Sequence, residues 1–163
     1  EVQLLSKQID LIDDYSNLVI LRTFSKWAGL AGMRIGYGIM NPSLVSHLLV
    51  IKPPYNISIA AEIAVKASLE DLELLLERVD IIKKERDWMF EQLNEIPFME
   101  PIKSDANFIL TKIVNLDSVE LYNRLLSKGI LVRYYENELL RNYLRISIGS
   151  RDQNQKLLDF IKQ

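Results

Sequence analysis

Glycine is concentrated in one short stretch of this chain, and that stretch constrains the local fold most. Four of the six glycines fall within residues 29–38, at positions Gly29, Gly32, Gly36 and Gly38. Glycine permits positive φ angles and lets the backbone approach a ligand closely, at an entropic cost that an ordinary loop avoids. Apolar runs at 18–21 and 35–40 flank the stretch and predict a strand on each side. We therefore expect a tight turn between two strands, with space for a ligand.

Two side chains in this turn carry complementary chemistry. The amine of Lys26 can form a Schiff base with an aldehyde, and the guanidinium of Arg34 can hold a phosphate with several donors. Thr23 and Ser25 alternate to one face of the preceding segment and offer hydroxyl donors to the same phosphate. Pyridoxal phosphate has both an aldehyde and a phosphate, so we expect it here. Taken alone, Lys26 also fits an exposed loop lysine, and Arg34 a surface arginine in a salt bridge.

The run Leu18-Val19-Ile20-Leu21 predicts the fold class. A continuous apolar run is typical of a strand buried on both faces of a parallel sheet. In α/β sheets, ligands bind beyond the carboxyl ends of the strands. We therefore expect an α/β fold with Lys26 at such an end.

The sequence predicts helices in the middle of the chain. Asn41-Pro42 predicts a helix to about Ile51, since proline suits a first helical turn. Lys52-Pro53-Pro54-Tyr55-Asn56 must end it, and a second helix is expected over 59–69. A long helix follows over 71–96, with apolar residues at the spacing of one buried face. Its length of about 39 Å exceeds the width of a small domain, so we expect it to link two domains.

Residues 97–163 have the pattern strand, helix, strand, strand, helix, which predicts a compact α+β unit. The expected strands are 107–114, 130–135 and 143–148, and the expected helices begin at Asp117 and Ser150. Strand alternation separates Arg145 from the apolar Leu144 and Ile146. Arg133 lies on the preceding strand, and two converging arginines suit a substrate with two anionic groups. The alternative is that both arginines pair with Glu136 and Glu138.

The composition of the chain argues against several kinds of binding site and partner. The net charge of −2 gives no basic field for nucleic acid, and the mixed run at 83–86 reads as a solvated helix face. Without cysteine there is no disulfide or thiolate metal site, and the single histidine, His47, excludes a multi-histidine metal site. No apolar run approaches the roughly 20 residues of a membrane helix. We expect a cytoplasmic protein that binds neither nucleic acid nor membranes.

Several segments together resemble the fold-type I pyridoxal-phosphate-dependent aminotransferases of class I/II, and most of all their histidinol-phosphate aminotransferase branch. The resemblance covers residues 18–163 and is carried, in order, by Leu21–Lys26, Gly29–Tyr37, Lys52–Asn56, Ala106–Phe108, Gly129–Arg133 and Leu144–Gly149. It implies that residues 1–70 are the C-terminal part of the large, mainly parallel-sheet domain that binds the cofactor. It further implies that 71–96 is the linking helix and 97–163 the small α+β domain.

The resemblance also implies roles for individual residues. Lys26 binds pyridoxal 5'-phosphate covalently and later carries a proton at the substrate Cα, while Arg34, Ser25 and Thr23 hold the phosphate. Arg145 binds the α-carboxylate of glutamate, and Arg133 the phosphate of histidinol phosphate. Tyr55 and Asn107 line the site. The implied reaction interconverts histidinol phosphate and 2-oxoglutarate with imidazole-acetol phosphate and glutamate, in histidine biosynthesis, within a homodimer.

The front of the family pattern is absent from this sequence. Members carry a glycine loop for the cofactor phosphate, an asparagine against the ring and an Asp-x-x-Tyr element whose aspartate pairs with the pyridine nitrogen. Because the sequence starts with Glu1 rather than Met and lacks these elements, we expect a C-terminal fragment with little transamination by itself. The alternatives are a related enzyme (an aromatic aminotransferase or a threonine-phosphate decarboxylase) and a non-catalytic association module.

Overall fold

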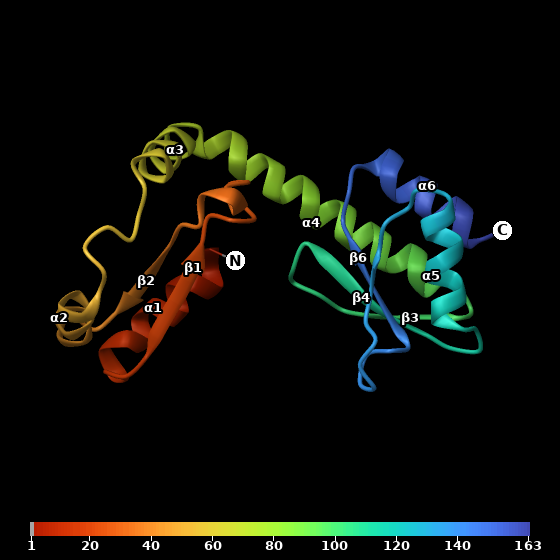
Figure 1. Ribbon diagram of the computed structural model, residues 1–163, viewed down its shortest axis with the longest axis horizontal. Coiled ribbons are helices and arrows are strands. Elements are labelled where there is room, and N and C mark those ends of the chain that lie inside the picture. The colour runs from red at the N-terminus through yellow and green to blue at the C-terminus, as the bar shows by residue number, and fades with distance from the viewer. Residues whose placement is uncertain (1) are drawn as a thin grey trace. The chain divides into compact units, whose positions relative to one another are not determined.

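The computed structural model describes residues 2–163, which divide into two compact units, Glu1–Leu76 and Glu77–Gln163 (Figure 1). Each unit is described by itself. Both predicted kinds of element, helices and sheets, are present, and the α/β class is confirmed.

The first unit contains a two-stranded sheet and several helices. Its elements are α1 (Val2–Asp14), β1 (Val19–Thr23), the short 3₁₀ turn η1 (Ala31–Met33), β2 (Gly36–Met40), α2 (Pro42–Ile51), α3 (Ile59–Glu70) and the start of α4 (Leu72–Asn94). The predicted helix starts are correct: the Asn41 side chain accepts from the Ser43 N–H, and Ser58 caps α3 through Ala61. Helix α1 was not predicted.

The sheet of the first unit differs from the expectation. β1 and β2 pair antiparallel, from Val19 opposite Met40 to Thr23 opposite Gly36, and alternate residues of β1 are exposed. The prediction of a parallel strand buried on both faces is therefore wrong for the described residues. A parallel pairing needs a crossover of a dozen or more residues, usually with a helix. The segment between β1 and β2 contains only η1, so the chain turns back on itself.

The second unit is a four-stranded antiparallel sheet with helices. After most of α4 come β3 (Met99–Ile102), β4 (Phe108–Ile113), α5 (Ser118–Ser127), β5 (Arg133–Tyr134), β6 (Tyr143–Ser147) and α6 (Arg151–Ile161). The strand order is β3-β4-β6-β5. The predicted strand–helix–strand–strand–helix pattern is confirmed. The short strand β3 was not predicted; it contains Pro101, a residue that is uncommon within strands.

One face of this sheet forms the core together with α4, α5 and α6 (Figure 1). The strands supply Met99, Ile109, Ile113, Leu144 and Ile146, and the helices supply Met89, Leu93, Leu121, Leu125, Leu157, Leu158 and Ile161. The buried face predicted for the long helix is continuous only in its C-terminal half, although Leu75 is also buried. Nearer its start, Leu72, Leu76 and Ile82 are exposed.

Polar contacts fix the ends of the helices in this unit. Asp117 accepts from the N–H groups of Val119 and Glu120 at the start of α5. Gly129, at φ +70°, follows the end of that helix as predicted. Ser150 and Gln153 form a reciprocal capping box at the start of α6.

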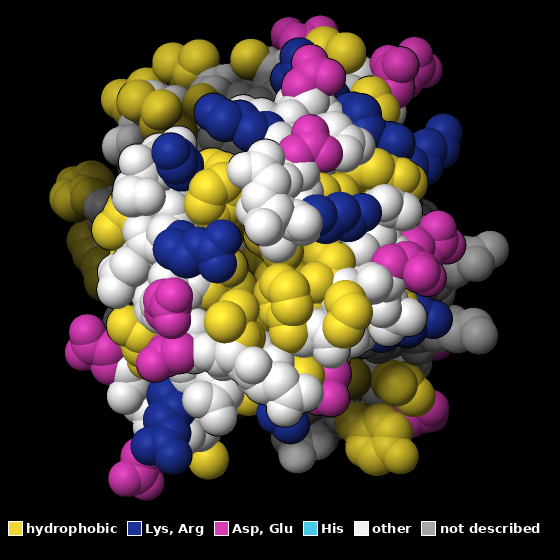
Figure 2. All heavy atoms as spheres, turned by 90° about the vertical axis from the view of Figure 1, so that its right-hand side faces the viewer, with side chains coloured by type: hydrophobic (Ala, Val, Ile, Leu, Met, Phe, Trp, Pro, Cys, Tyr) yellow, Lys and Arg dark blue, Asp and Glu magenta, His cyan; other side chains and the backbone are white. Residues whose placement is uncertain are grey.

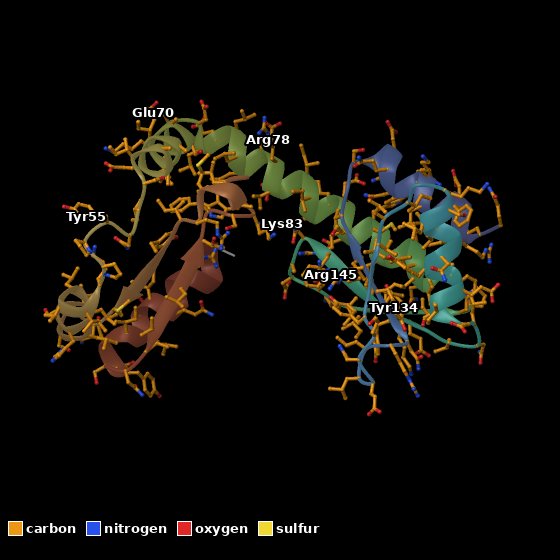
Figure 3. The ribbon with its side chains drawn as sticks, viewed as in Figure 1. Tyr55, Glu70, Arg78, Lys83, Tyr134 and Arg145 are labelled. Atoms are coloured by element: carbon orange, nitrogen blue, oxygen red, sulfur yellow. The ribbon has the colours of Figure 1, made fainter. Side chains whose placement is uncertain are left out.

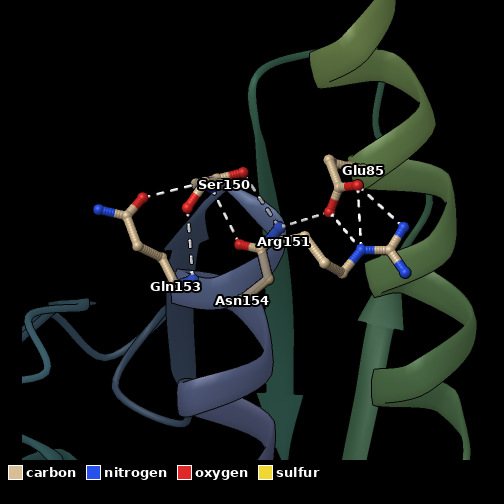
Figure 4. Close-up of polar contacts among 6 residues, drawn as sticks. Glu85, Ser150, Arg151, Gln153 and Asn154 are labelled. Atoms are coloured by element: carbon tan, nitrogen blue, oxygen red, sulfur yellow. Dashed lines mark hydrogen bonds and ion pairs between the residues drawn. The ribbon is translucent and has the colours of Figure 1, made fainter.

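A polar network joins α4 to α6 (Figure 4). The Arg151 guanidinium donates to both carboxylate oxygens of Glu85, at 2.8–3.0 Å, and the Asn154 amide donates to Glu85 Oε2 at 3.1 Å. Asn154 also bonds both backbone groups of Gly149. The side chains of Glu85 and Arg86 are only 12% and 14% exposed. The interpretation of 83–86 as a solvated face is therefore wrong for these two residues.

The network makes stability depend on pH. The Arg151 guanidinium lowers the pKa of Glu85 below its ordinary value of 4.5. A lowered folded-state pKa stabilises the fold above the unfolded-state value, and the contribution disappears as the pH falls through the folded-state pKa. We expect Glu85→Gln to lower the free energy of unfolding by about 1–2 kcal/mol at neutral pH. Urea unfolding of both proteins should show this difference shrinking below about pH 4.5; a difference that is constant with pH would contradict it.

The surface of the second unit is not uniformly polar. Figure 2 shows hydrophobic side chains together at the centre of one side, with Lys and Arg side chains around them.

Within residues 2–163, no helix is both long enough and apolar enough to cross a membrane.

Candidate active site

The loop between β1 and β2 carries both Lys26 and Arg34. The loop is closed at its base, where Thr23 pairs with Gly36 and the Phe24 N–H donates to the Ile35 carbonyl at 3.3 Å. A Cβ at Gly36 would collide with the Arg22 carbonyl oxygen, so this close approach of the strands requires glycine.

Aromatic packing anchors the loop. Phe24 and Ala28 are buried with Leu75, and the Phe24 ring contacts those of Trp27 and Tyr37, with centroids 5.4 and 5.5 Å apart. The Leu30 N–H donates to the Phe24 carbonyl at 3.1 Å. These contacts fix the backbone on both sides of Lys26, while the lysine itself is exposed.

Thr23 and Ser25 lie together at the start of the loop. Their hydroxyl oxygens are 2.7 Å apart, and the Ser25 N–H donates to Thr23 Oγ1 at 3.1 Å. The predicted common face of these two residues is thus present. The amine of Lys26, between them and Gly29, forms no hydrogen bond or ion pair with any described residue. An amine without a partner is available to react with an aldehyde.

Arg34 has an unusual backbone conformation. Its φ of +55° and ψ of +41° place it in the left-handed region, directly after η1. A residue with a Cβ pays for this conformation in free energy, and such strain is often found at functional sites. The Arg34 Nη1 donates to the Ala31 carbonyl at 2.8 Å, while the side chain stays exposed. Its other guanidinium donors have no partner among the described residues.

Tyr55 belongs to the same unit but has no neighbour that orients it. It projects from the loop between α2 and α3 and is 95% exposed (Figure 3). The loop is held by Lys52, whose Nζ donates to the Pro53 carbonyl and to Asn56 Oδ1. Within its unit, therefore, Tyr55 is not brought together with Lys26 or Arg34.

In the second unit, Arg133 and Arg145 lie directly opposite each other on β5 and β6. Arg145 is on the sheet face opposite Leu144 and Ile146, which are buried in the core. Neither arginine forms an ion pair with a carboxylate of the described residues, so the alternative of pairing with Glu136 and Glu138 is not observed there. Like charges directly opposite on a sheet repel. An anion bound between them would remove this repulsion.

Arg145 contacts an aromatic ring that the sequence did not point to. Its guanidinium carbon lies 5.0 Å from the centroid of Phe108 on β4, and its Nε is buried without a hydrogen-bond partner among the described residues. Phe108 was noted only as part of the Ala106-Asn107-Phe108 segment. Asn107 precedes β4, where its carbonyl accepts from the Ile148 N–H at 3.0 Å and its side chain is exposed.

Comparison of the sequence with known proteins identifies a family and several similar proteins. Residues 2–161 match the family described as Aminotransferase class I and II. A histidinol-phosphate aminotransferase of Dehalococcoides mccartyi is 44% identical over 144 residues, which are 88% of this chain and 40% of that protein.

Solved structures give the same family. The histidinol-phosphate aminotransferase of Clostridium acetobutylicum matches with a TM-score of 0.85 and 33% identity, over 94% of this chain and 47% of that one. The enzyme of that name from Sinorhizobium meliloti, in complex with pyridoxal-5'-phosphate, matches with a TM-score of 0.78 and 27% identity, over 94% of this chain and 44% of that one. This chain thus spans about 40% of the length of the curated relatives it matches.

Proposed function

This chain belongs to the class I and II aminotransferases, and we propose that it contributes the lysine loop and the substrate arginines of a histidinol-phosphate aminotransferase. The proposed reaction exchanges the amino group of histidinol phosphate with 2-oxoglutarate, giving imidazole-acetol phosphate and glutamate. The observation that carries this proposal is the closed loop at 24–35, which presents an amine and guanidinium donors that have no partner among the residues the structure describes.

The loop fits the cofactor of the family, pyridoxal 5'-phosphate. Lys26 offers the amine for its aldehyde, and Arg34 with the hydroxyls of Ser25 and Thr23 offers donors for its phosphate. When bound, the cofactor withdraws electrons from the bonds at the substrate Cα. The amine of Lys26 would also take up and return the proton at the substrate Cα, as a general base and acid.

The arginine pair of the second unit supplies the substrate contacts. We assign Arg145 to the α-carboxylate of glutamate and Arg133 to the phosphate of histidinol phosphate, because a guanidinium binds either group with two parallel hydrogen bonds. Tyr55 and Asn107 are proposed to line the substrate site. Both are exposed and therefore open to a ligand.

We also propose the domain organisation, oligomeric state, location and partners of the whole enzyme. We infer that α4 links a cofactor-binding domain to a small substrate domain, that the whole enzyme works as a cytoplasmic homodimer, and that it binds neither nucleic acid nor membranes. The net charge of −2 supports the last point as regards nucleic acid.

The substitution Arg34→Gly tests the proposed phosphate contact and should leave the fold intact. Glycine accepts the left-handed conformation, so the free energy of unfolding should change by less than about 1 kcal/mol. We expect the affinity for pyridoxal phosphate to fall about tenfold or more, because a charged hydrogen-bond donor is lost. The affinity for pyridoxal, which has no phosphate, should be unchanged. Equal weakening of both ligands in equilibrium dialysis would contradict the role of Arg34.

The proposed function is tested by turnover. We expect the 163-residue chain, supplied with pyridoxal phosphate, histidinol phosphate and 2-oxoglutarate, to form little or no glutamate, because the Asp-x-x-Tyr element that family members place at the pyridine nitrogen is absent from this sequence. A longer protein containing this chain and that element should form glutamate, and Lys26→Ala should stop it. Glutamate formation by the short chain itself, lost in Lys26→Ala, would overturn the expectation of dependence on that element.

A further inference from the structure

We propose that Phe108 is a positioning residue, whose ring holds the Arg145 guanidinium ready for an anion. This inference rests on the proposed function of Arg145 and extends it to a residue that needs no contact with the substrate. The two side chains share one sheet face, since Phe108 pairs with Ser147, two residues beyond Arg145 on β6. The guanidinium carbon lies 5.0 Å from the ring centroid, within the range of a cation–π interaction.

The charge on Arg145 has no other compensation among the described residues. No carboxylate there forms an ion pair with it, its Nε is buried without a partner, and Arg133 faces it directly. The negative face of an aromatic ring is the remaining attraction that acts on the guanidinium. Phe108 therefore offsets part of the cost of holding this cation at the sheet surface.

Arg151 in the same unit shows a different arrangement. Its guanidinium also lies over an aromatic ring, that of Trp88 at 3.7 Å, but it is bound at the same time by both carboxylate oxygens of Glu85. Arg151 is thus neutralised within the fold. Arg145 has the ring without the carboxylate. A ring orients a guanidinium without occupying its hydrogen-bond donors, so the donors stay free for a ligand.

Glutamate binding by the 163-residue chain tests this role, with glutamate as the probe of the carboxylate contact and calorimetry as the measurement. We expect Phe108→Leu to weaken binding about three- to tenfold, and Phe108→Tyr, which keeps the ring, to restore it. Phe160→Leu is the matched control, because Phe160 lies 5.7 Å below another guanidinium, that of Arg124. The control should bind glutamate like the original chain.

The outcomes separate the two hypotheses. If Arg145→Gln leaves glutamate affinity unchanged, the proposed function of Arg145 is wrong and the role of Phe108 is overturned with it. If Arg145→Gln weakens binding but Phe108→Leu does not, only the role of Phe108 is overturned. The unaltered chain gives a further test that does not depend on how variants fold. Its Arg145 Nε–H proton resonance should be displaced by the ring and exchange slowly with water, and a freely exchanging, undisplaced signal overturns the proposal.

Discussion

Lys26→Ala is expected to remove covalent pyridoxal phosphate binding and to lower affinity about a hundredfold or more, since the bond between amine and aldehyde is lost. The variant should still bind pyridoxamine phosphate, which has no aldehyde, as well as the original chain does. The remaining interaction is the phosphate contact at Arg34. Equilibrium dialysis with both ligands measures the two affinities directly.

Lys66→Ala is the matched control for this experiment. Lys66 is an exposed lysine of α3 in the same unit, but its Nζ is engaged by Glu62 at 2.7 Å. We expect its removal to leave pyridoxal phosphate affinity unchanged. If Lys66→Ala and Lys26→Ala weaken binding equally, the ligand reacts with exposed lysines in general and the assignment of Lys26 fails.

Leu144→Ala is expected to lower the free energy of unfolding of the second unit by about 3–5 kcal/mol. Leu144 is 0% exposed and lies on β6 between Thr111 of β4 and Tyr134 of β5. Small domains have about 5–15 kcal/mol of stability in total, so much of it would be lost. Because Arg145 is the next residue, the sheet face that carries Arg145 should be lost together with the core in the same unfolding transition.

Thermal and urea unfolding measure this effect, with Leu139→Ala as the control. Leu139 is 87% exposed, so its replacement should change stability by less than about 0.5 kcal/mol. Similar losses in the two variants would mean that β6 is not the centre of the core.

The sequence allowed most of the helices and strands to be predicted, because their signals are local. Caps such as Asn41, Asp117 and Ser150, and the glycine after α5, act within one turn of the chain. Lys26 and Arg34 could likewise be grouped from the sequence alone, because they lie in one loop. The grouping of Thr23 with Ser25 also followed from neighbouring positions.

Features that depend on pairing between distant segments were not predictable. An apolar run such as 18–21 does not say which strand lies beside it, and here the neighbour is antiparallel. The contact of Phe108 with Arg145 depends on the register of β4 and β6. The burial of Glu85 depends on Arg151 and Asn154, which are 66 and 69 residues away. Nothing in the local composition of α4 indicates these partners.

A labelling experiment tests whether Lys26 is the amine that takes the cofactor. The 163-residue chain is incubated with pyridoxal phosphate, treated with borohydride to make the bond permanent, digested and analysed by mass spectrometry. We predict that the label is found on the peptide containing Lys26, well above every other lysine, and that excess inorganic phosphate reduces it. Label spread evenly over the exposed lysines, with no preference for Lys26, would contradict the account.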